Sequence, residues 1–306
     1  MPDEPRIGVP SLDQLRVFLA VVETGSFAAA GRQLKRATSA VSYAIANLEL
    51  QLGLALFDRE QTRKPVLTEA GRALLSKARA IEVGVDDLRA TVKGLLLGLE
   101  AEVSLVVDVM LPPARLVDAV QAFEAQFPTV TLRVHVEALS AVAQLVQSGT
   151  AGLGVGGTVH TSLPGINRVQ IGDVEMIPVA AAGHPLARKG RKQPGEVNRY
   201  RQLVLTVRSS FAEGEDYGVY GAATWRLADL GAKHALLIAG SGWGFMPEPM
   251  VRDDLASGCL VRLRLPDVPG GSYPLQAIYR ADSPPGPAAA WLVQRFIDQT
   301  KERARL

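Results

Sequence analysis

A regular spacing of apolar residues in the first third of the chain constrains its fold more than any other feature. An a/d pattern held over about three heptads predicts one long helix with an apolar seam, the geometry of a coiled-coil pair. The same seam could instead pack on the helix's own domain, and Gly84 and Gly94 weaken the helix. Because the other positions are mostly polar, we expect dimerisation. The seam residues alternate in steps of four and three: Leu74, Ala78, Ile81, Val85, Leu88, Val92 and Leu95.

Three shorter helices are predicted before this seam. Apolar residues at helical spacing begin at Leu12, and Gly25 ends this first helix. Ser26 can cap a second helix, and a turn at 35–37 leads into a third helix over 38–50. A helix, a short turn and a helix form the unit that places its second member in the major groove of DNA. Pro65 and its charged neighbours then indicate a small hairpin or wing, and Thr68 can cap the long helix.

The helix over 38–50 has two contrasting faces. Its apolar residues Val41, Ile45 and Leu48 would pack on a core. The opposite face carries hydrogen-bonding side chains that suit DNA base edges, although an ordinary solvated face would look the same. These polar residues are Thr38, Ser39, Ser42 and Tyr43.

The charge distribution agrees with a nucleic-acid surface in this region. The whole chain has a net charge of only +2, but residues 31–79 hold nine basic and four acidic residues, a local excess of +5. A phosphate-binding surface needs such a local excess, not a charged whole. The basic residues expected to hold phosphates are Arg32, Arg36, Arg59, Arg63 and Lys64.

From Val103 onward, short apolar runs alternate with helical patterns, which predicts parallel sheet with right-handed crossovers. The first series has expected strands at 103–110, 130–137 and 152–157 and helices at 114–126 and 139–148. The second series has expected strands at 174–182, 203–207 and 234–240, helices at 219–230 and 246–256, a strand at 273–280 and a last helix at 287–302.

Two α/β units joined by more than one chain crossing enclose a cleft, the usual site for a small ligand. We expect the residues that contact such a ligand, called effector residues below, to lie on loops at the carboxyl ends of strands. The first of these loops is "MLPPA", and side chains could equally fill the space between the units. The candidates are Met110, Leu111, Leu139, Ser140, Thr206, Ser209, Ser241 and Trp243.

The motifs "ETGSFAAA", "LE…LG…LF.R" and "LTEAG" occur in this order within residues 11–71. With this order and spacing, residues 11–71 closely resemble the LysR-type transcriptional regulators. The resemblance implies a winged helix-turn-helix domain at 11–68 and a linker and dimerisation helix at 69–97. It also implies a two-subdomain α/β effector domain at 98–306, similar to periplasmic binding proteins. Subdomain I would cover about 98–173 and 273–306, and subdomain II about 174–272.

The resemblance also assigns roles by position. Ser26 falls where the family anchors a phosphate, Arg59 and Arg63 fall on the wing, and the effector loops match those lining the inducer cavity. The family often has a serine or threonine in the first of these loops, and its absence from "MLPPA" favours an apolar or aromatic ligand. The family often has Ser-Gln-Pro where this chain has Ala37, Thr38 and Ser39, so Thr38 or Ser39 would have to cap the recognition helix. Tyr43 stands where a basic residue is common, which predicts a different base preference.

Other classes of protein are less well supported by the sequence. The glycine runs "GLGVGG" and "GSGWGF" lack the GxGxxG spacing of dinucleotide sites, and no hydrolase motif or metal-ligand spacing occurs. We therefore expect no catalytic residue, metal or cofactor. The lone Cys259 and a start without signal-peptide character favour the cytoplasm. No apolar run is long enough for a membrane span.

The expected function is a non-enzymatic DNA-binding regulator. Its expected partners are a double-stranded DNA operator with inverted-repeat symmetry, a small-molecule effector and further copies of the chain in a dimer or tetramer, with RNA polymerase as a candidate partner. The alternatives are a small-molecule-binding module that does not bind DNA and an enzyme built on the α/β half.

Overall fold

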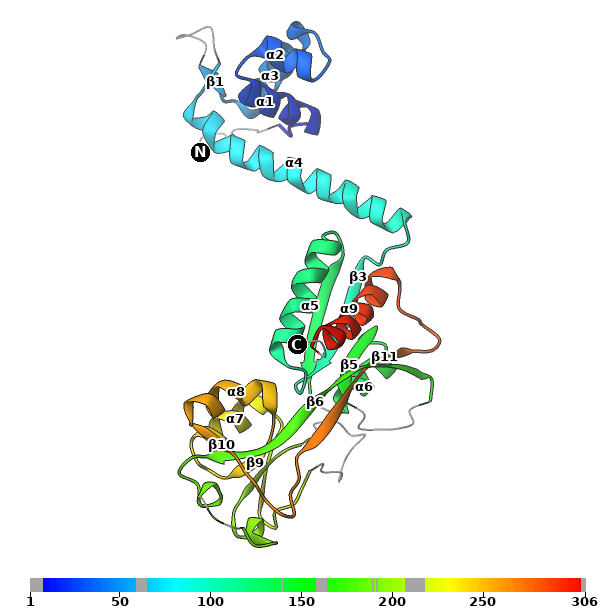
Figure 1. Ribbon diagram of the computed structural model, residues 1–306. Helices are drawn as coiled ribbons and strands as arrows, with labels where there is room; N and C mark the ends of the chain where they lie inside the picture. Colours follow the sequence, from blue (N-terminus) through cyan, green and yellow to red (C-terminus); the bar gives the residue numbers. More distant parts are fainter. Residues whose placement is uncertain are drawn as a thin grey trace, which may run out of the picture. The chain divides into compact units, whose positions relative to one another are not determined.

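The computed structural model divides the chain into two compact units, residues Met1–Lys93 and Gly94–Leu306, each of which is described by itself (Figure 1). The structure describes residues 8–58, 65–138, 140–157, 164–188, 190, 192–206 and 218–303.

The first unit begins with the three expected helices. Helix α1 (Leu12–Thr24) carries a capping box between Ser11 and Gln14 and ends at Gly25, whose φ of 67° is left-handed. Helix α2 (Phe27–Gln33) and helix α3 (Thr38–Leu52) follow. Their apolar faces meet in one core, which confirms the predicted inward positions of the third helix. This core contains Phe18, Val21, Ala30, Val41, Ile45, Leu48 and Phe57.

The prediction that Thr38 or Ser39 caps α3 is wrong. The N-cap residue is Ala37, and no side chain supplies a capping hydrogen bond. The backbone of the turn sets this boundary, because the amide of Arg36 donates to the carbonyl of Gly31 at 2.8 Å and the amide of Val41 to that of Ala37 at 3.2 Å. Thr38 therefore lies already inside the first turn of the helix.

A short antiparallel hairpin follows, with β1 (Phe57–Asp58) paired to β2 (Val66–Leu67). The hydroxyl of Thr68 then accepts a hydrogen bond from the amide of Gly71 at 3.0 Å, so Thr68 caps helix α4 (Glu69–Leu96) as predicted. The predicted wing contacts Arg59, Arg63 and Lys64 lie outside the described residues.

The apolar seam of α4 is divided between two environments. Ala78 is 1% exposed and belongs to the core of the first unit, and Leu74 packs partly against that core. Ala78 is thus buried by its own domain and cannot serve the pairing surface predicted for it. Val85 is half-buried, while Ile81, Leu88, Val92 and Leu95 present apolar surface to solvent and are between 44% and 61% exposed.

In the second unit, the described strands form one nine-stranded sheet in the order β4-β3-β5-β11-β6-β9-β7-β8, with β10 pairing with β6. Its first half is parallel as predicted, because β3 pairs with both β4 and β5 in parallel. The elements of this half are β3 (Glu102–Asp108), α5 (Pro113–Gln126), β4 (Thr131–Glu137), α6 (Ala141–Gln147), β5 (Leu153–Gly157) and α9 (Pro287–Arg303).

Two long antiparallel strands, β6 (Ile166–Ala181) and β11 (Gly271–Arg280), run from one half of the sheet to the other (Figure 1). The second half contains two short 3-10 turns (Pro185–Ala187 and Glu196–Arg199), β7 (Gln202–Leu205), β8 (Thr224–Leu227), α7 (Leu230–Ile238), β9 (Trp243–Pro247), α8 (Glu248–Ser257) and β10 (Leu260–Arg262).

Two predictions in this second half are wrong. The expected helix at 219–230 contains strand β8, and the expected strand at 234–240 lies largely in helix α7. The carboxylate of Asp229 caps α7 by accepting from the amide of Ala232 at 2.6 Å, and alanine and leucine favour a helix after that cap. The periodicity of a short apolar run is compatible with both a strand and a helix, and the cap at Asp229 favours the helix.

Candidate DNA-binding surface and ligand pocket

Helix α3 presents one polar face to solvent. Val41, Ile45 and Leu48 are completely buried, so they fix the orientation of the helix on its core. The four predicted base-reading residues on the opposite face, Thr38, Ser39, Ser42 and Tyr43, are all exposed.

The polar residues predicted to hold phosphates have mixed surroundings. The Ser26 hydroxyl accepts from the amide of Ala29 at 2.9 Å and caps α2, and Arg32 is exposed. Arg36 forms a bidentate ion pair with Asp13 of α1, with both nitrogen–oxygen distances 2.7 Å. The hydrogen bond from Arg36 holds the pKa of Asp13 below its ordinary value. The charge of Arg36 is thus balanced by a neighbour that sequence reasoning did not identify.

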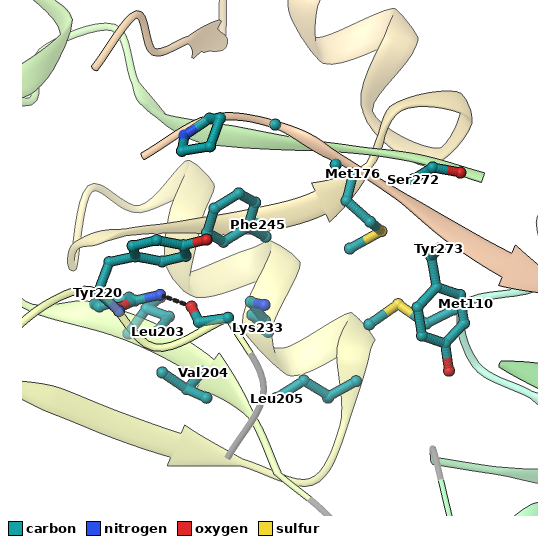
Figure 2. Close-up of a pocket in the computed structure, with 15 residues that line it drawn as sticks. Met110, Met176, Leu203, Val204, Leu205, Tyr220, Lys233, Phe245, Ser272 and Tyr273 are labelled. Carbon is teal, nitrogen blue, oxygen red and sulfur yellow. Dashed lines mark hydrogen bonds between the residues drawn. The ribbon is translucent and has the colours of Figure 1, made fainter. Parts of the chain in front are cut away.

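A cavity of about 210 Å³ lies in the second unit, where β7, β9 and α7 meet the two long strands β6 and β11 (Figure 2). Its walls are mostly apolar or aromatic. The lining residues are Met110, Met176, Gln202, Leu203, Val204, Leu205, Gly218, Tyr220, Lys233, Phe245, Pro269, Gly270, Gly271, Ser272 and Tyr273.

Of the predicted effector residues, Met110 lines this cavity. Leu111 belongs instead to the core under the first half of the sheet, and Ser140 is 2% exposed. Thr206 and Ser241 are half-buried and are not part of the described lining. Leu139 and Ser209 lie outside the described residues.

Trp243 is completely buried in a separate cluster with Leu186 and Val197. The sequence placed the run "GSGWGF" after a strand, whereas in the structure it follows helix α7 and starts β9. Ser241 and Trp243 therefore lie at the amino end of β9. Phe245, two residues further along the same face, lines the cavity.

Lys233 is the most unusual side chain of the cavity and was missed by the sequence reasoning. It is 3% exposed, and among the described residues its amine has no hydrogen-bond or ionic partner. Burial lowers the pKa of Lys233 from its ordinary 10.5 to about 8. Leu230, Lys233 and Leu237 form the buried stripe of α7, so a helical interpretation of 230–238 would have placed this lysine on an apolar face.

Two other polar side chains of the lining, those of Gln202 and Tyr273, are hydrogen-bonded within the protein. The Gln202 amide donates to the carbonyl of Gly218 at 2.6 Å, and its oxygen accepts from the amides of Tyr220 and Gly221, each at 2.8 Å. The Tyr273 hydroxyl donates to the carboxylate of Asp108 at 2.7 Å. Gln202 therefore shapes the loop that forms one wall of the cavity, while Asp108 fixes the ring of Tyr273.

Within the part of the chain that the structure describes, no histidine, cysteine and carboxylate groups gather as a metal site. None of the described helices combines the length and apolar character needed to cross a bilayer.

Two family models match most of the chain. Residues 12–72 match the bacterial regulatory helix-turn-helix protein of the lysR family, and residues 98–301 match the LysR substrate binding domain. The first match contains the polar face of α3, and the second contains the cavity around Lys233.

Curated relatives and solved structures agree with these matches. The chain is 29% identical to the HTH-type transcriptional regulator AceR of Acinetobacter baumannii, covering 95% of this chain and 98% of AceR. It is 28% identical to the transcriptional activator AllS of Klebsiella pneumoniae, covering 81% and 93% of the two chains. A cysteine mutant of OxyR from Corynebacterium glutamicum shares the fold, with a TM-score of 0.55, 19% identity and coverage of 98% and 95%. The chain belongs to the LysR family of transcriptional regulators, with a helix-turn-helix DNA-binding domain followed by a substrate-binding domain.

Proposed function

We propose that this regulator reads an inverted-repeat operator with the exposed face of α3, assembles through α4 and responds to a small molecule in the 210 Å³ cavity. In this proposal, residues 11–68 bind DNA, 69–97 link and pair the subunits, and 98–306 bind the effector. The cytoplasm is the proposed location, and RNA polymerase is a candidate partner.

One observation carries the DNA-binding part of the proposal: the core side of α3 is completely buried while its hydroxyl-bearing side is free. A helix fixed in this way can enter a major groove without disturbing its domain. Side-chain hydroxyls give directional hydrogen bonds to base edges, whereas Arg32 and the other basic residues would contact phosphates.

Ser42→Ala and Tyr43→Ala are each expected to weaken binding to a fragment from the protein's own promoter region. A base contact is worth about 1–3 kcal/mol, so the loss should be about 5- to 150-fold, with little change for unrelated DNA. Mobility shift at fixed salt measures both affinities. Leu50→Ala is the matched control, because Leu50 is 80% exposed in the last turn of α3 and should change affinity less than about twofold.

Unchanged affinity and sequence preference in both variants would refute the assignment of this face. Failure of the wild-type protein to retard any promoter fragment at low salt would instead favour the alternative function, a small-molecule-binding module that does not bind DNA.

Leu88→Glu is expected to weaken dimer formation at least about 100-fold, because each of two chains would lose a buried leucine and gain a buried charge. Leu88 is 61% exposed on the free chain. Ala90→Glu, on an exposed position two residues further along α4, adds the same charge outside the seam and should leave the dimer intact. Sedimentation over a concentration series separates the outcomes, and equal behaviour of the two variants would reject the seam as the interface.

A solved structure with the same fold supports the effector part of the proposal. The regulator LysG of Corynebacterium glutamicum was determined with arginine as bound effector, at a TM-score of 0.50 and 20% identity to this chain. The cavity around Lys233 is the place we propose for an effector in this protein.

A further inference from the structure

We propose that the cavity takes a small organic monoanion, a carboxylate on an apolar body, and that Lys233 is the residue that binds its charge. This inference rests on the proposed function of the cavity as the effector site and adds the chemical class of the effector.

The first argument is the unbalanced charge of Lys233. Its amine lies among apolar and aromatic side chains (Figure 2), and among the described residues it has neither an ionic nor a hydrogen-bonding partner. An ammonium group removed from water costs several kcal/mol unless a counter-charge and hydrogen bonds replace its hydration. The described lining contains no aspartate or glutamate to supply that counter-charge. A bound carboxylate would supply it.

The second argument is that the neighbouring polar side chains already have partners. Both ends of the Gln202 amide are used by the loop at 218–221, and the Ser272 hydroxyl donates to the carboxylate of Asp173 at 2.7 Å. The Tyr273 hydroxyl donates to Asp108, so the remaining polar side chains of the described lining are Lys233 and Tyr220. Recognition of a ligand by charge therefore falls to Lys233.

The third argument concerns size and the number of charges. At about 30 Å³ for each water of liquid, a cavity of 210 Å³ has the volume of about seven waters, which suits a small acid. Met110, Met176, Leu203 and Phe245 surround this volume and favour an apolar or aromatic body. A second negative charge would be buried without a described cation opposite it, so a monoanion is favoured over a dianion.

The experiment uses the full chain and pairs of compounds that differ in charge but not in shape. The carboxylates are benzoate, phenylacetate and hexanoate, and each is compared with its amide; phenyl phosphate tests a dianion. Binding is measured by calorimetry and by thermal unfolding. We expect at least one carboxylate to bind, with its amide and phenyl phosphate at least about tenfold weaker.

Lys233→Met is expected to weaken carboxylate binding at least about 30-fold, while Lys233→Arg keeps a positive charge and retains part of the affinity. Lys301→Met is the matched control, because Lys301 is exposed on α9, and it should bind as the wild type does. Thermal unfolding of each variant, measured without compounds, verifies that it is folded.

The inference is overturned if no carboxylate binds, if an amide binds as tightly as its acid, or if Lys233→Met binds the carboxylate as the wild type does. Mobility shift on the same samples keeps the two proposals apart. A chain that retards promoter DNA but fails these tests loses only the inference, whereas one that passes them but never retards DNA loses the DNA-binding proposal.

Discussion

Arg115→Met is expected to lower the free energy of unfolding of the second unit by about 3–5 kcal/mol, as is typical when one member of a buried polar network is removed. Arg115 is 3% exposed in α5. Its guanidinium donates to the carbonyls of Ile171 at 2.9 Å and Phe296 at 2.8 Å, and to the side chain of Gln299 at 3.1 Å. Methionine fills a similar volume but removes all of these hydrogen bonds from the buried network.

The loss of the Arg115 hydrogen bonds is expected to affect the long strands β6 and β11, because Ile171 lies in β6. The pairing of β6 with β11 shifts its register beside Leu275, and the neighbouring Gly172 has a φ of 113°. Ile171 is the extra residue of this bulge, so its carbonyl is not used by the ladder in the regular way. Arg115 and Thr300 both donate to it, and they join α5 and α9 to the strand that connects the two halves of the sheet.

Tryptophan fluorescence in a urea titration measures this effect, because all three tryptophans of the chain, Trp225, Trp243 and Trp291, lie in the second unit. Arg295→Met is the control on the same helix pair. Arg295 forms a bidentate pair with Asp118, but their side chains are 25% and 45% exposed, so the expected loss is about 1 kcal/mol or less. Equal losses of unfolding free energy in the two variants would show that the buried network around Arg115 stabilises the unit no more than the exposed ion pair does.

Lys233→Met is expected to stabilise the unliganded protein at pH 7 by an amount on the order of 3 kcal/mol. The depression of the Lys233 pKa from 10.5 to about 8 corresponds to this amount at about 1.36 kcal/mol per pKa unit. Methionine has a similar shape and carries no charge into the apolar cavity. At about 2–4 °C per kcal/mol for a unit of this size, the melting temperature should rise by about 6–12 °C.

The pH dependence of this gain has a definite sign. Below pH 8, Lys233 is protonated in both the folded and the unfolded chain, so the full cost of burying the charge is present. Between about pH 8 and 10.5, the folded chain has released the proton while the unfolded chain still binds it, and the wild type gains stability relative to the variant. The advantage of Lys233→Met should therefore be largest at pH 7 and shrink toward pH 10.

Thermal unfolding of both proteins between pH 7 and pH 10 checks this prediction, with Lys301→Met as a control that should follow the wild type. A destabilised Lys233→Met protein, or a gain that is constant over this range, would contradict the burial cost assigned to the lysine. A stabilised variant that no longer binds carboxylates would show that the charge of Lys233 lowers the stability of the protein but is needed for ligand binding.

Most helix ends of the first unit could be predicted from the sequence because their signals are local. Gly25, Ser26 and Thr68 mark helix ends through contacts within three or four residues. The spacing of Val41, Ile45 and Leu48 identifies the buried side of α3, so the exposed face opposite could be named residue by residue. The parallel order of β3, β4 and β5 also followed from alternating strands and helices.

Only the tertiary structure decided the ion pair of Arg36, the division of the α4 seam and the composition of the cavity. Asp13 and Arg36 are 23 positions apart, and Ala78 is buried by helices that lie far earlier in the chain. Met110, Lys233 and Tyr273 meet in the cavity from three distant segments. Periodicity determines which side of an element is buried, but contacts between distant segments depend on how whole elements pack. For this reason the polar face of α3 could be predicted from the sequence, whereas the burial of Lys233 beside an apolar cavity could not.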